Sequence, residues 1–313
     1  RLEGILSSLC ANNDSDFEVI VVNDMSTDNT SLVAQKYGVR LIEISELKHG
    51  FAGKTNACDV GVQASKGELI VFLDADTNVA HNFVSTIREM FSNEETKVVT
   101  LQPKHKMKST FEQFSLFFHI SAISATGIFS CRTFGFGLYG PCIAMTKSVY
   151  FETEGFANKS VRSSIVEDVA LSRVIEKSEI NIDRYIGNDL IEYKMYDNLK
   201  DLFLGWKRNI SAGFRYAPNL PALILVLFYG SLISVLVELF INQSYTSVFV
   251  AIFILQYILI INVALKLGNY VIGAVLYPFT LLFFMVVFFA SAFTYIFKLN
   301  TTWAGRKIKV AEK

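Results

Sequence analysis

Cysteine and histidine are scarce in this sequence, and those present lack the spacing of disulfide partners or zinc ligands. The 313 residues include only four of each. No Cys-x-x-Cys pair occurs, and the histidines stand far apart. These absences exclude a secreted disulfide scaffold and a clustered zinc site. We expect the cysteines to be reduced, buried and apolar; they are Cys10, Cys58, Cys131 and Cys142.

An excess of either charge is absent as well, since 29 lysines and arginines balance 29 acidic residues. A net charge of zero argues against a nucleic-acid partner. The charges are nevertheless unevenly distributed. From Leu220 to Asn300 only Glu238, Lys266 and Lys298 are charged, whereas the other 232 residues hold 55 charges. This contrast predicts a soluble domain followed by a membrane region.

The first residues have the spacing of a helix, with Leu2, Ile5, Leu6 and Leu9 on one face. An α/β domain normally opens with a strand. We therefore expect that one strand is missing ahead of this helix.

From there the chain alternates between short apolar runs and segments with helical spacing. Such alternation predicts an α/β fold with a mostly parallel sheet and helices on both faces. We expect strands at 18–24, 39–44, 68–74, 97–102 and 141–145, helices at 28–37, 54–65, 81–92, from 166 onward and at 197–210, and two short strands within 180–195.

A second apolar segment, Phe111–Ser130, contains one charged residue and follows a lysine-rich stretch, Lys104–Lys108. One interpretation is a buried core helix. The other, which we favour, is a helix in the membrane interface behind a basic patch.

Three long apolar blocks follow near the end of the chain. Leu220–Ile241 and Thr246–Leu265 are each long enough to cross about 30 Å of hydrocarbon. Tyr270–Phe297 is longer and contains Pro278, so it either forms a third span or is a re-entrant or interfacial pair of helices. Basic residues precede the first block, which predicts a multi-pass protein of the cell membrane with a cytoplasmic soluble domain.

We expect three segments: a cytoplasmic domain over 1–218, membrane helices over 219–300 and a basic tail over 301–313. The tail carries Arg306, Lys307, Lys309 and Lys313, so it is also expected inside. Three full spans would put the tail outside the cell. The charge of the tail and the length of Tyr270–Phe297 thus point to different topologies for the third block.

Two carboxylates, Asp74 and Asp76, follow the strongly apolar run Glu68–Leu73. If strand geometry continued through them, both would point to one face. Like charges held together are costly unless a cation lies near them, and hard oxygen ligands suit Mg²⁺ or Mn²⁺. In an open α/β sheet, ligands bind beyond the carboxyl ends of the strands, where Asp24 is also expected.

These residues belong to an ordered series of motifs that resembles the family 2 glycosyltransferases with the GT-A fold. The matching segments are Val21–Thr30 with Asp24, Gly53–Ala57 with Lys54, the Asp74-Ala-Asp76 motif, Gly140–Met145, Glu154–Phe156, Glu167-Asp168 and Trp303–Arg306. Within that family the chain is most similar to membrane-bound enzymes that glycosylate carotenoid acids and to their lipid-glycosylating relatives.

The resemblance implies an inverting hexosyltransferase that takes a UDP-sugar and modifies a membrane-resident lipid or carotenoid. Asp76 and Asp74 would hold the metal, and Asp74 would also contact the nucleotide-sugar donor. Asp168, in the first turn of a helix where the dipole keeps a carboxylate ionised, would be the catalytic base.

Two further donor contacts are expected. Asp24 would accept a hydrogen bond from the uracil or ribose, although it could instead cap the following helix. Lys54 would contact the diphosphate at a helix start, although it could be a solvated surface lysine. Trp206 is either an interface anchor or part of an acceptor pocket.

Two other functions are alternatives to that of a glycosyltransferase acting on a lipid or carotenoid. A processive polysaccharide synthase resembling the family would need an intact Gln-x-x-Arg-Trp motif, of which Leu202–Trp206 keeps only the tryptophan. A non-catalytic, membrane-anchored protein that binds a nucleotide sugar would not need Asp74, Asp76 and Asp168 together. The sequence leaves the sugar, the acceptor and its reacting group, hydroxyl or carboxyl, undetermined.

Overall fold

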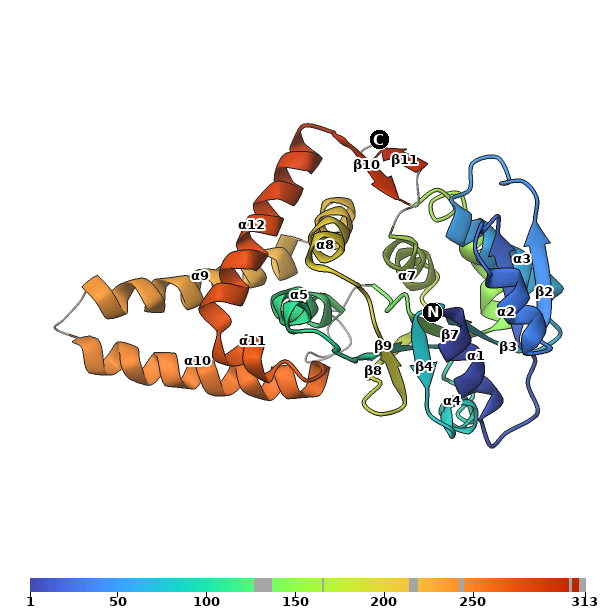
Figure 1. The fold of residues 1–313 in the computed structure, drawn as a ribbon, viewed down its shortest axis with the longest axis horizontal. Helices are drawn as coiled ribbons and strands as arrows, with labels where there is room; N and C mark the ends of the chain where they lie inside the picture. The colour runs from blue at the N-terminus through green and yellow to red at the C-terminus, as the bar shows by residue number, and fades with distance from the viewer. Residues whose placement is uncertain (127–136, 165, 214–218, 242–244, 304–305, 310–313) are drawn as a thin grey trace. The chain divides into compact units, whose positions relative to one another are not determined.

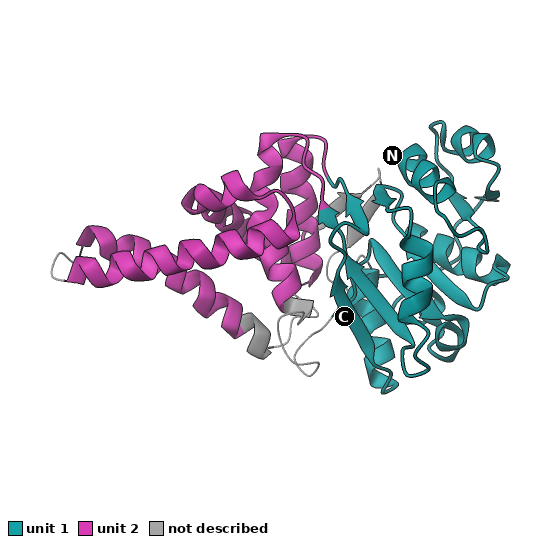
Figure 2. Ribbon diagram, turned by 90° about the horizontal axis from the view of Figure 1, so that it is seen from below, with its two compact units in different colours: residues 1–104, 136–195 teal, residues 105–135, 196–313 magenta. Residues whose placement is uncertain are grey.

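A computed structural model describes residues 1–126, 137–164, 166–213, 219–241, 245–303 and 306–309. The chain divides into two compact units, coloured separately in Figure 2. Unit 1 comprises residues 1–104 and 136–195, and unit 2 comprises residues 105–135 and 196–313. The predicted class, an α/β domain with apolar C-terminal helices, is confirmed (Figure 1).

Unit 1 contains nearly every strand and helix expected from the sequence. In chain order they are α1 (Leu2–Cys10), β1 (Ile20–Asp24), α2 (Thr30–Lys36), β2 (Arg40–Ile44), α3 (Gly53–Ala64), β3 (Leu69–Leu73), β4 (Thr77–Val79), α4 (Phe83–Met90), β5 (Val98–Gln102), β7 (Cys142–Thr146), α6 (Lys147–Glu152), η2 (Gly155–Ala157), α7 (Glu167–Lys177), β8 (Ile182–Ile186) and β9 (Ile191–Tyr193). The short strand β6 (Lys104–His105) lies where the sequence passes from unit 1 to unit 2.

The main sheet has the strand order β3-β7-β5-β8. β7 runs antiparallel to both neighbours, whereas β5 and β8 pair in parallel with Val98 opposite Ile182. Three of the four strands therefore share one direction and β7 opposes them. Among the described residues, no helix of unit 1 lies between β6 and β7 in the chain, so the direction of β7 is not fixed by the rule for parallel strands.

The core of unit 1 forms where α1 and α4 cover this sheet. Ile5 and Leu9 of α1 meet Phe83 and Ile87 of α4 on the apolar side chains of β5 and β7, among them Leu101. The helical spacing found in the first residues is thus a buried face, as predicted. Of the cysteines, Cys142 is buried in this core, but Cys10 is exposed and corrects the expectation that all are buried. Cys10 ends α1 on the face away from the core.

A cavity of about 730 Å³ runs between two strand edges in unit 1. Among the described residues, β1 pairs only with β2, and β3 pairs only with β7. Consecutive residues of both strands, 18–22 and 68–74, line the cavity. A cavity on one face of a strand would be lined by every second residue. Because consecutive residues line this cavity, it runs along the edges of the two strands. The strand expected ahead of the first helix stays a prediction.

Unit 2 is helical apart from a hairpin near its end. It contains η1 (Thr110–Ser115), α5 (Leu116–Thr126), α8 (Leu199–Gly213), α9 (Asn219–Ile241), α10 (Thr246–Leu267), α11 (Val271–Val275), α12 (Tyr277–Ile296) and the antiparallel pair β10 (Asn300–Trp303) and β11 (Arg306–Lys309). α5 and α8 pack with α12 in unit 2. The predicted division into a cytoplasmic domain, membrane helices and a tail concerns position relative to a membrane and stays a prediction.

Aromatic side chains form the core of unit 2. Phe118 of α5 stacks on Trp206 of α8 at 4.7 Å and meets Phe284 of α12 at 5.0 Å between ring centroids. The Trp206 indole Nε1 donates to the Ser115 hydroxyl at 3.0 Å. Trp206 is therefore a packed core residue, which neither of its two expected roles anticipated.

The predicted helix over 111–130 is present as η1 and α5, and residues 127–130 lie outside the described part of the chain. The buried side chains of this segment, among them Leu116, Phe117 and Ile123, make it part of the unit 2 core. Contact of the same segment with a membrane surface stays a prediction.

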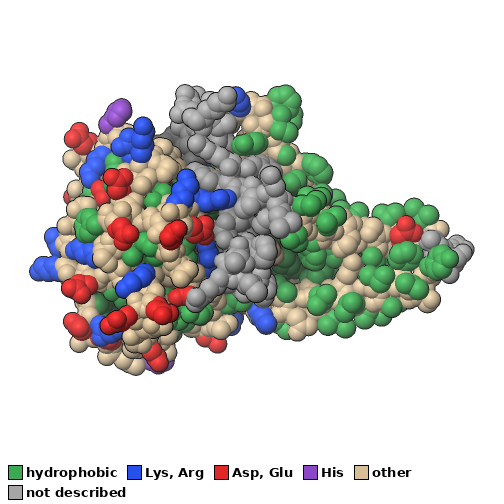
Figure 3. All heavy atoms as spheres, turned by 180° about the vertical axis from the view of Figure 1, so that it is seen from behind, with side chains coloured by type: hydrophobic (Ala, Val, Ile, Leu, Met, Phe, Trp, Pro, Cys, Tyr) green, Lys and Arg blue, Asp and Glu red, His purple; other side chains and the backbone are tan. Residues whose placement is uncertain are grey.

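Three helices of unit 2 are long and apolar enough to cross a membrane: α9 over Leu223–Ile241, α10 over its whole length and α12 over its whole length. On the face drawn in Figure 3, most of the charged side chains lie over unit 1, and hydrophobic side chains predominate over the helices of unit 2. The predicted loop at 242–245 and the end of the basic tail lie outside the described residues, except for Tyr245.

The packing of α4 predicts a large loss of stability when Phe83 is truncated. Phe83 is 2% exposed in the core, so Phe83→Ala should cost about 3–5 kcal/mol and lower the melting temperature measured in detergent. Leu32→Ala in α2 removes a side chain that is 65% exposed and should change the melting temperature little. Equal melting temperatures for the two variants would contradict this description of the core.

Candidate active site

The two carboxylates after β3 lie in a turn. β3 ends at Leu73 and β4 begins at Thr77. The Thr77 backbone N–H and its hydroxyl both donate to the Asp74 carbonyl, at 3.1 and 2.7 Å. The expectation that a continuing strand points both side chains to one face is therefore wrong: Asp74 and Asp76 are brought near each other by a turn that links two strands of different sheets.

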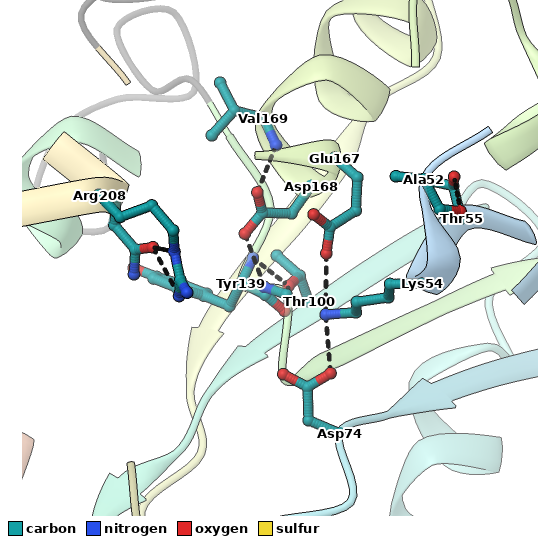
Figure 4. A network of polar contacts seen from close by, with 12 residues as sticks. Ala52, Lys54, Thr55, Asp74, Thr100, Tyr139, Glu167, Asp168, Val169 and Arg208 are labelled. Carbon is teal, nitrogen blue, oxygen red and sulfur yellow. Dashed lines mark hydrogen bonds and ion pairs between the residues drawn. The ribbon is translucent and has the colours of Figure 1, made fainter. Parts of the chain in front are cut away.

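Lys54 lies between two carboxylates from distant parts of the chain. Its Nζ is 2.7 Å from Asp74 Oδ1 and 2.8 Å from Glu167 Oε1 (Figure 4). Lys54 is in the first turn of α3, Asp74 follows β3, and Glu167 begins α7. Burial disfavours the lysine charge, but Glu167 and Asp74 outweigh it and hold the Lys54 pKa well above its usual value. Lys54 is thus an ion-paired lysine whose side chain is 30% exposed, and its contact with a diphosphate stays a prediction.

Asp168 is held beside this cluster by two backbone amides. Its Oδ1 accepts from the Val169 N–H at 2.8 Å, and its Oδ2 accepts from the Gly140 N–H at 3.2 Å. A Cβ at position 140 would lie 2.8 Å from Asp168 Oδ2, so only glycine lets the backbone approach this closely.

Hydrogen bonds to a residue of β5 hold the loop that carries Gly140. The Thr100 hydroxyl on β5 accepts from the Tyr139 N–H at 2.8 Å and donates to the Cys142 carbonyl at 2.9 Å. Thr100 is fully buried. A buried hydroxyl with both hydrogen-bonding roles satisfied anchors the loop, and through it the position of the Asp168 carboxyl.

Burial and neighbouring charge alter the acidity of two of the predicted site residues. Burial, and then the charge of Glu167, raise the pKa of Asp168 to about 7. Burial, and then the charge of Asp74, raise the pKa of Asp76 to about 6. The expectation that the helix dipole keeps Asp168 ionised is corrected: desolvation and a like charge act more strongly than the helix terminus.

Asp24 ends β1, at the carboxyl end of the strand where it was predicted. Asp28 stabilises the start of α2, because its Oδ1 accepts a hydrogen bond from the Thr30 N–H at 3.0 Å. Asn23 Oδ1 accepts from the Ser26 N–H at 3.0 Å and shapes the intervening turn. The helix-capping alternative for Asp24 is therefore not needed, and its contact with a nucleotide stays a prediction.

The chemistry of the donor set fits a hard divalent cation at Asp74 and Asp76. Two adjacent carboxylates, one with a raised pKa, are a pair that a cation would stabilise. Among the described residues no group of three or more acidic, histidine or cysteine side chains could hold a metal. The protein would therefore supply two ligands and leave positions for phosphate oxygens and water, which is the usual environment of Mg²⁺.

Unit 1 thus brings Lys54, Asp74, Glu167 and Asp168 together. Sequence reasoning missed the ionic role of Glu167, taken only as the partner of Asp168, and missed the contact made by Gly140. Gly140 belongs to a matched motif before β7, so its importance could be inferred from the sequence. Its contact could not, because Asp168 lies 28 residues away in the chain.

Residues 1–153 match the description "Glycosyl transferase family 2". The chain contains a glycosyl transferase family 2 domain. The resemblance inferred from the ordered motifs is confirmed at this level, and the family 2 domain accounts for most of unit 1.

Two curated relatives are 4,4'-diaponeurosporenoate glycosyltransferases. The Staphylococcus haemolyticus protein is 26% identical over 243 residues, which are 75% of this chain and 64% of the relative. The Staphylococcus aureus (strain USA300) protein is 30% identical over 227 residues, which are 70% of this chain and 60% of the relative. The matched part of the chain thus spans about three fifths of each relative.

Among solved structures, the chain is similar to glucosyl-3-phosphoglycerate synthase from Mycobacterium tuberculosis, determined with Mn²⁺, UDP and glucosyl-3-phosphoglycerate. The TM-score is 0.46 at 16% identity, over 70% of this chain and 76% of the synthase.

The close approach of Gly140 to Asp168 predicts that Gly140→Ala will be destabilising. The added methyl group must displace the Asp168 carboxyl or the loop, so we expect a loss of about 1–3 kcal/mol, measured as a lower melting temperature. Gly67→Ala is the matched control, because its Cβ would meet its nearest atom at an ordinary 3.5 Å. A Gly140→Ala variant as stable as Gly67→Ala would mean that the loop is not held against Asp168.

Proposed function

We propose that this chain is an inverting glycosyltransferase that moves a hexose from a UDP-sugar to a lipid or carotenoid in the membrane. The observation that carries the proposal is a constellation of charged side chains in unit 1, which consists of Lys54, Asp74, Asp76, Glu167 and Asp168. It combines a cation, a carboxylate pair suited to a metal and a buried carboxyl that titrates near neutrality.

On the donor side, Asp74 and Asp76 would hold Mg²⁺ or Mn²⁺, which supplies charge neutralisation for the leaving diphosphate when bound. Lys54 is already positioned at this carboxylate by its 2.7 Å ion pair with Asp74. Its ammonium would contact the diphosphate directly. Asp24, at the carboxyl end of β1, would contact the uracil or the ribose.

On the acceptor side, Asp168 would take the proton of an attacking hydroxyl. The acceptor oxygen forms its bond to the anomeric carbon from the face opposite the nucleotide, while the bond to the diphosphate breaks, so the configuration inverts. A base works best when its pKa lies close to the operating pH, and that of Asp168 is raised to about 7. The two backbone N–H groups on its carboxyl keep it oriented.

The membrane acceptor is supported by two observations of different kinds. The curated relatives are named for a carotenoid acid, diaponeurosporenoate. The chain also carries helices long and apolar enough to cross a membrane. A catalytic domain tied to such helices meets an apolar acceptor where that acceptor resides. We place the enzyme in the cell membrane with its family 2 domain in the cytoplasm.

The two alternative functions are less well supported. Leu202 and Trp206, within the degenerate motif, are buried in the helical core of unit 2, which favours a structural role over the one expected in a processive synthase. A binding protein without turnover would not need to bury Asp168 so that its pKa approaches neutrality.

Replacing Asp168 separates the two classes of acceptor. For a hydroxyl acceptor, Asp168→Asn should lower kcat by about 10²–10⁴-fold, because general-base help is lost while donor binding survives. A carboxylic acid acceptor is already ionised at neutral pH and needs no base, so the same variant should then lose little. The measurement is turnover in membranes, with mass spectrometry of the lipid extract.

The control is Asp189→Asn, because Asp189 is an exposed carboxylate of the same unit with a side chain 90% exposed. It should leave turnover unchanged. With a hydroxyl acceptor, wild-type kcat/KM should fall as the pH drops below about 7, because protonated Asp168 cannot accept a proton. Asp168→Asn should lose that dependence. Near wild-type turnover of Asp168→Asn on a hydroxyl acceptor would remove Asp168 from catalysis.

The metal assignment predicts a loss of metal-dependent donor binding. Asp76→Asn should abolish the increase in UDP affinity that Mn²⁺ produces in titration calorimetry, since one of two protein ligands is gone. Asp189→Asn again serves as the control and should keep the increase. An unchanged effect of Mn²⁺ in Asp76→Asn would exclude Asp76 as a ligand.

A further inference from the structure

Helix α12 has two different faces along its whole length. One face is buried and consists of Tyr277, Thr280, Leu281, Phe284, Val287, Ser291 and Thr294. The other is exposed and apolar and consists of Phe279, Leu282, Val286, Phe289, Phe293 and Ile296. Each set recurs every three or four residues, which is the period of one helix face. α12 is thus covered by protein on one side and presents a continuous apolar stripe on the other.

The buried face of α12 packs on elements that carry charges. Within unit 2 its most extensive contact is with α8, followed by η1 and α5. Phe283 of α12 meets Phe203 of α8 at 6.2 Å between ring centroids. α8 also carries Lys200 and Asp201, both exposed. A spanning α12 would hold this charged helix against hydrocarbon, where such side chains are costly.

Other parts of the protein cover less of helices α9 and α10 than of α12. In the most apolar 18-residue windows, 17% of α9 and 11% of α10 are buried, against 33% for α12. The fully buried residues of α10 are confined to its last turns, at Ile260, Ala264 and Leu267. From Thr246 to Leu259, none of its side chains is buried. A helix that is apolar all round and exposed all round is suited to lipid on every side.

The end of α10 is fixed by a polar junction. The Gln113 amide donates to the Asn269 carbonyl at 2.8 Å and accepts from the Gly273 N–H at 2.7 Å. His105 pairs with the Tyr270 hydroxyl and bridges to Gly268. Irregular backbone directly after a last turn that carries Lys266 is typical of the end of a membrane span.

The junction places both ends of the α9–α10 hairpin at the same surface. α9 follows the charged helix α8 in the sequence, and α10 ends at the junction with Lys266 in its last turn. The chain therefore returns to the side from which it left. α12 begins at Tyr277, directly after the junction and α11.

The direction of α12 agrees with this placement. In Figure 1, α9 and α10 run together while α12 crosses their direction steeply. When two helices cross a bilayer, a helix at a steep angle to them lies near the membrane plane.

We propose that only α9 and α10 cross the bilayer and that α12 is an in-plane helix, with its exposed apolar stripe immersed in one leaflet and its buried face on α5 and α8. An even number of crossings returns the tail to the side of α8. The basic tail with Arg306, Lys307 and Lys309 is then on the cytoplasmic side, as its charge requires.

Reporter fusions test the number of crossings in the full chain. A fluorescent protein that matures only in the cytoplasm and an alkaline phosphatase active only outside are placed ahead of Arg1, after Ser244 and after Lys313. We expect the fusions at Arg1 and Lys313 to report the same side and the fusion at Ser244 to report the other. A Lys313 fusion on the same side as Ser244 would mean three crossings and would overturn the proposal.

The depth of labelled side chains tests the orientation of α12 separately. Single cysteines replace Phe279, Val286 and Phe293 in a chain whose four native cysteines are alanine, and a fluorophore on each is quenched by lipids spin-labelled at different depths. An in-plane helix should give one shallow depth for all three. Val226, Ile233 and Phe240 of α9 are the matched controls and should differ in depth. Graded depths along α12, deepest at Val286, would overturn the proposal even if the fusions could not be expressed.

Discussion

The ion pairs of Lys54 with Asp74 and Glu167 are the interaction on which the site in unit 1 depends. Four acidic side chains, Asp74, Asp76, Glu167 and Asp168, gather at the ends of separate elements, and such a group of like charges is unstable without a cation. Lys54 supplies one positive charge where the first turn of α3 meets the end of β3 and the start of α7. The balance is incomplete: burial first, and then the charge of Asp74 and of Glu167, still raise the pKa values of Asp76 and Asp168. The remaining negative charge is what makes the site suited to a metal cation and to proton transfer.

Much of the fold could be predicted because local pattern and tertiary structure agree in unit 1. The run Glu68–Leu73 contains the strand β3 (Leu69–Leu73), and the helical spacing of Leu2–Leu9 is a buried face. The direction of β7 was not predictable from its own residues, since an apolar strand looks the same in a parallel and an antiparallel pair. The division into two contact units is not visible in the sequence for a different reason. Residues 105–135 join the C-terminal helices through contacts such as Phe118 with Phe284, which join residues 166 positions apart.

The candidate site shows the same division between local and distant information. The motifs identified Asp24, Lys54, Asp74, Asp76 and Asp168 as a set, because residue types and order are visible in a sequence. What these groups do to one another is not visible there. The turn at Asp74–Thr77 replaces the expected strand, and the charge of Glu167, together with burial, opposes the helix dipole at Asp168. Both effects depend on how helices and strands lie relative to one another in unit 1. A sequence motif gives only the types and order of the residues.

The cavity between β1 and β3 has a consequence for how this 313-residue chain would associate when it is isolated by itself. Two strand edges that each lack a second partner among the described residues offer backbone donors and acceptors to any extended chain. The lining includes apolar side chains of helices, such as Leu6 and Val62, so the cavity favours a hydrophobic segment. In a concentrated preparation of this chain, a strand of a neighbouring copy is a segment of that kind. Strand exchange between copies is therefore the form of self-association that this cavity favours.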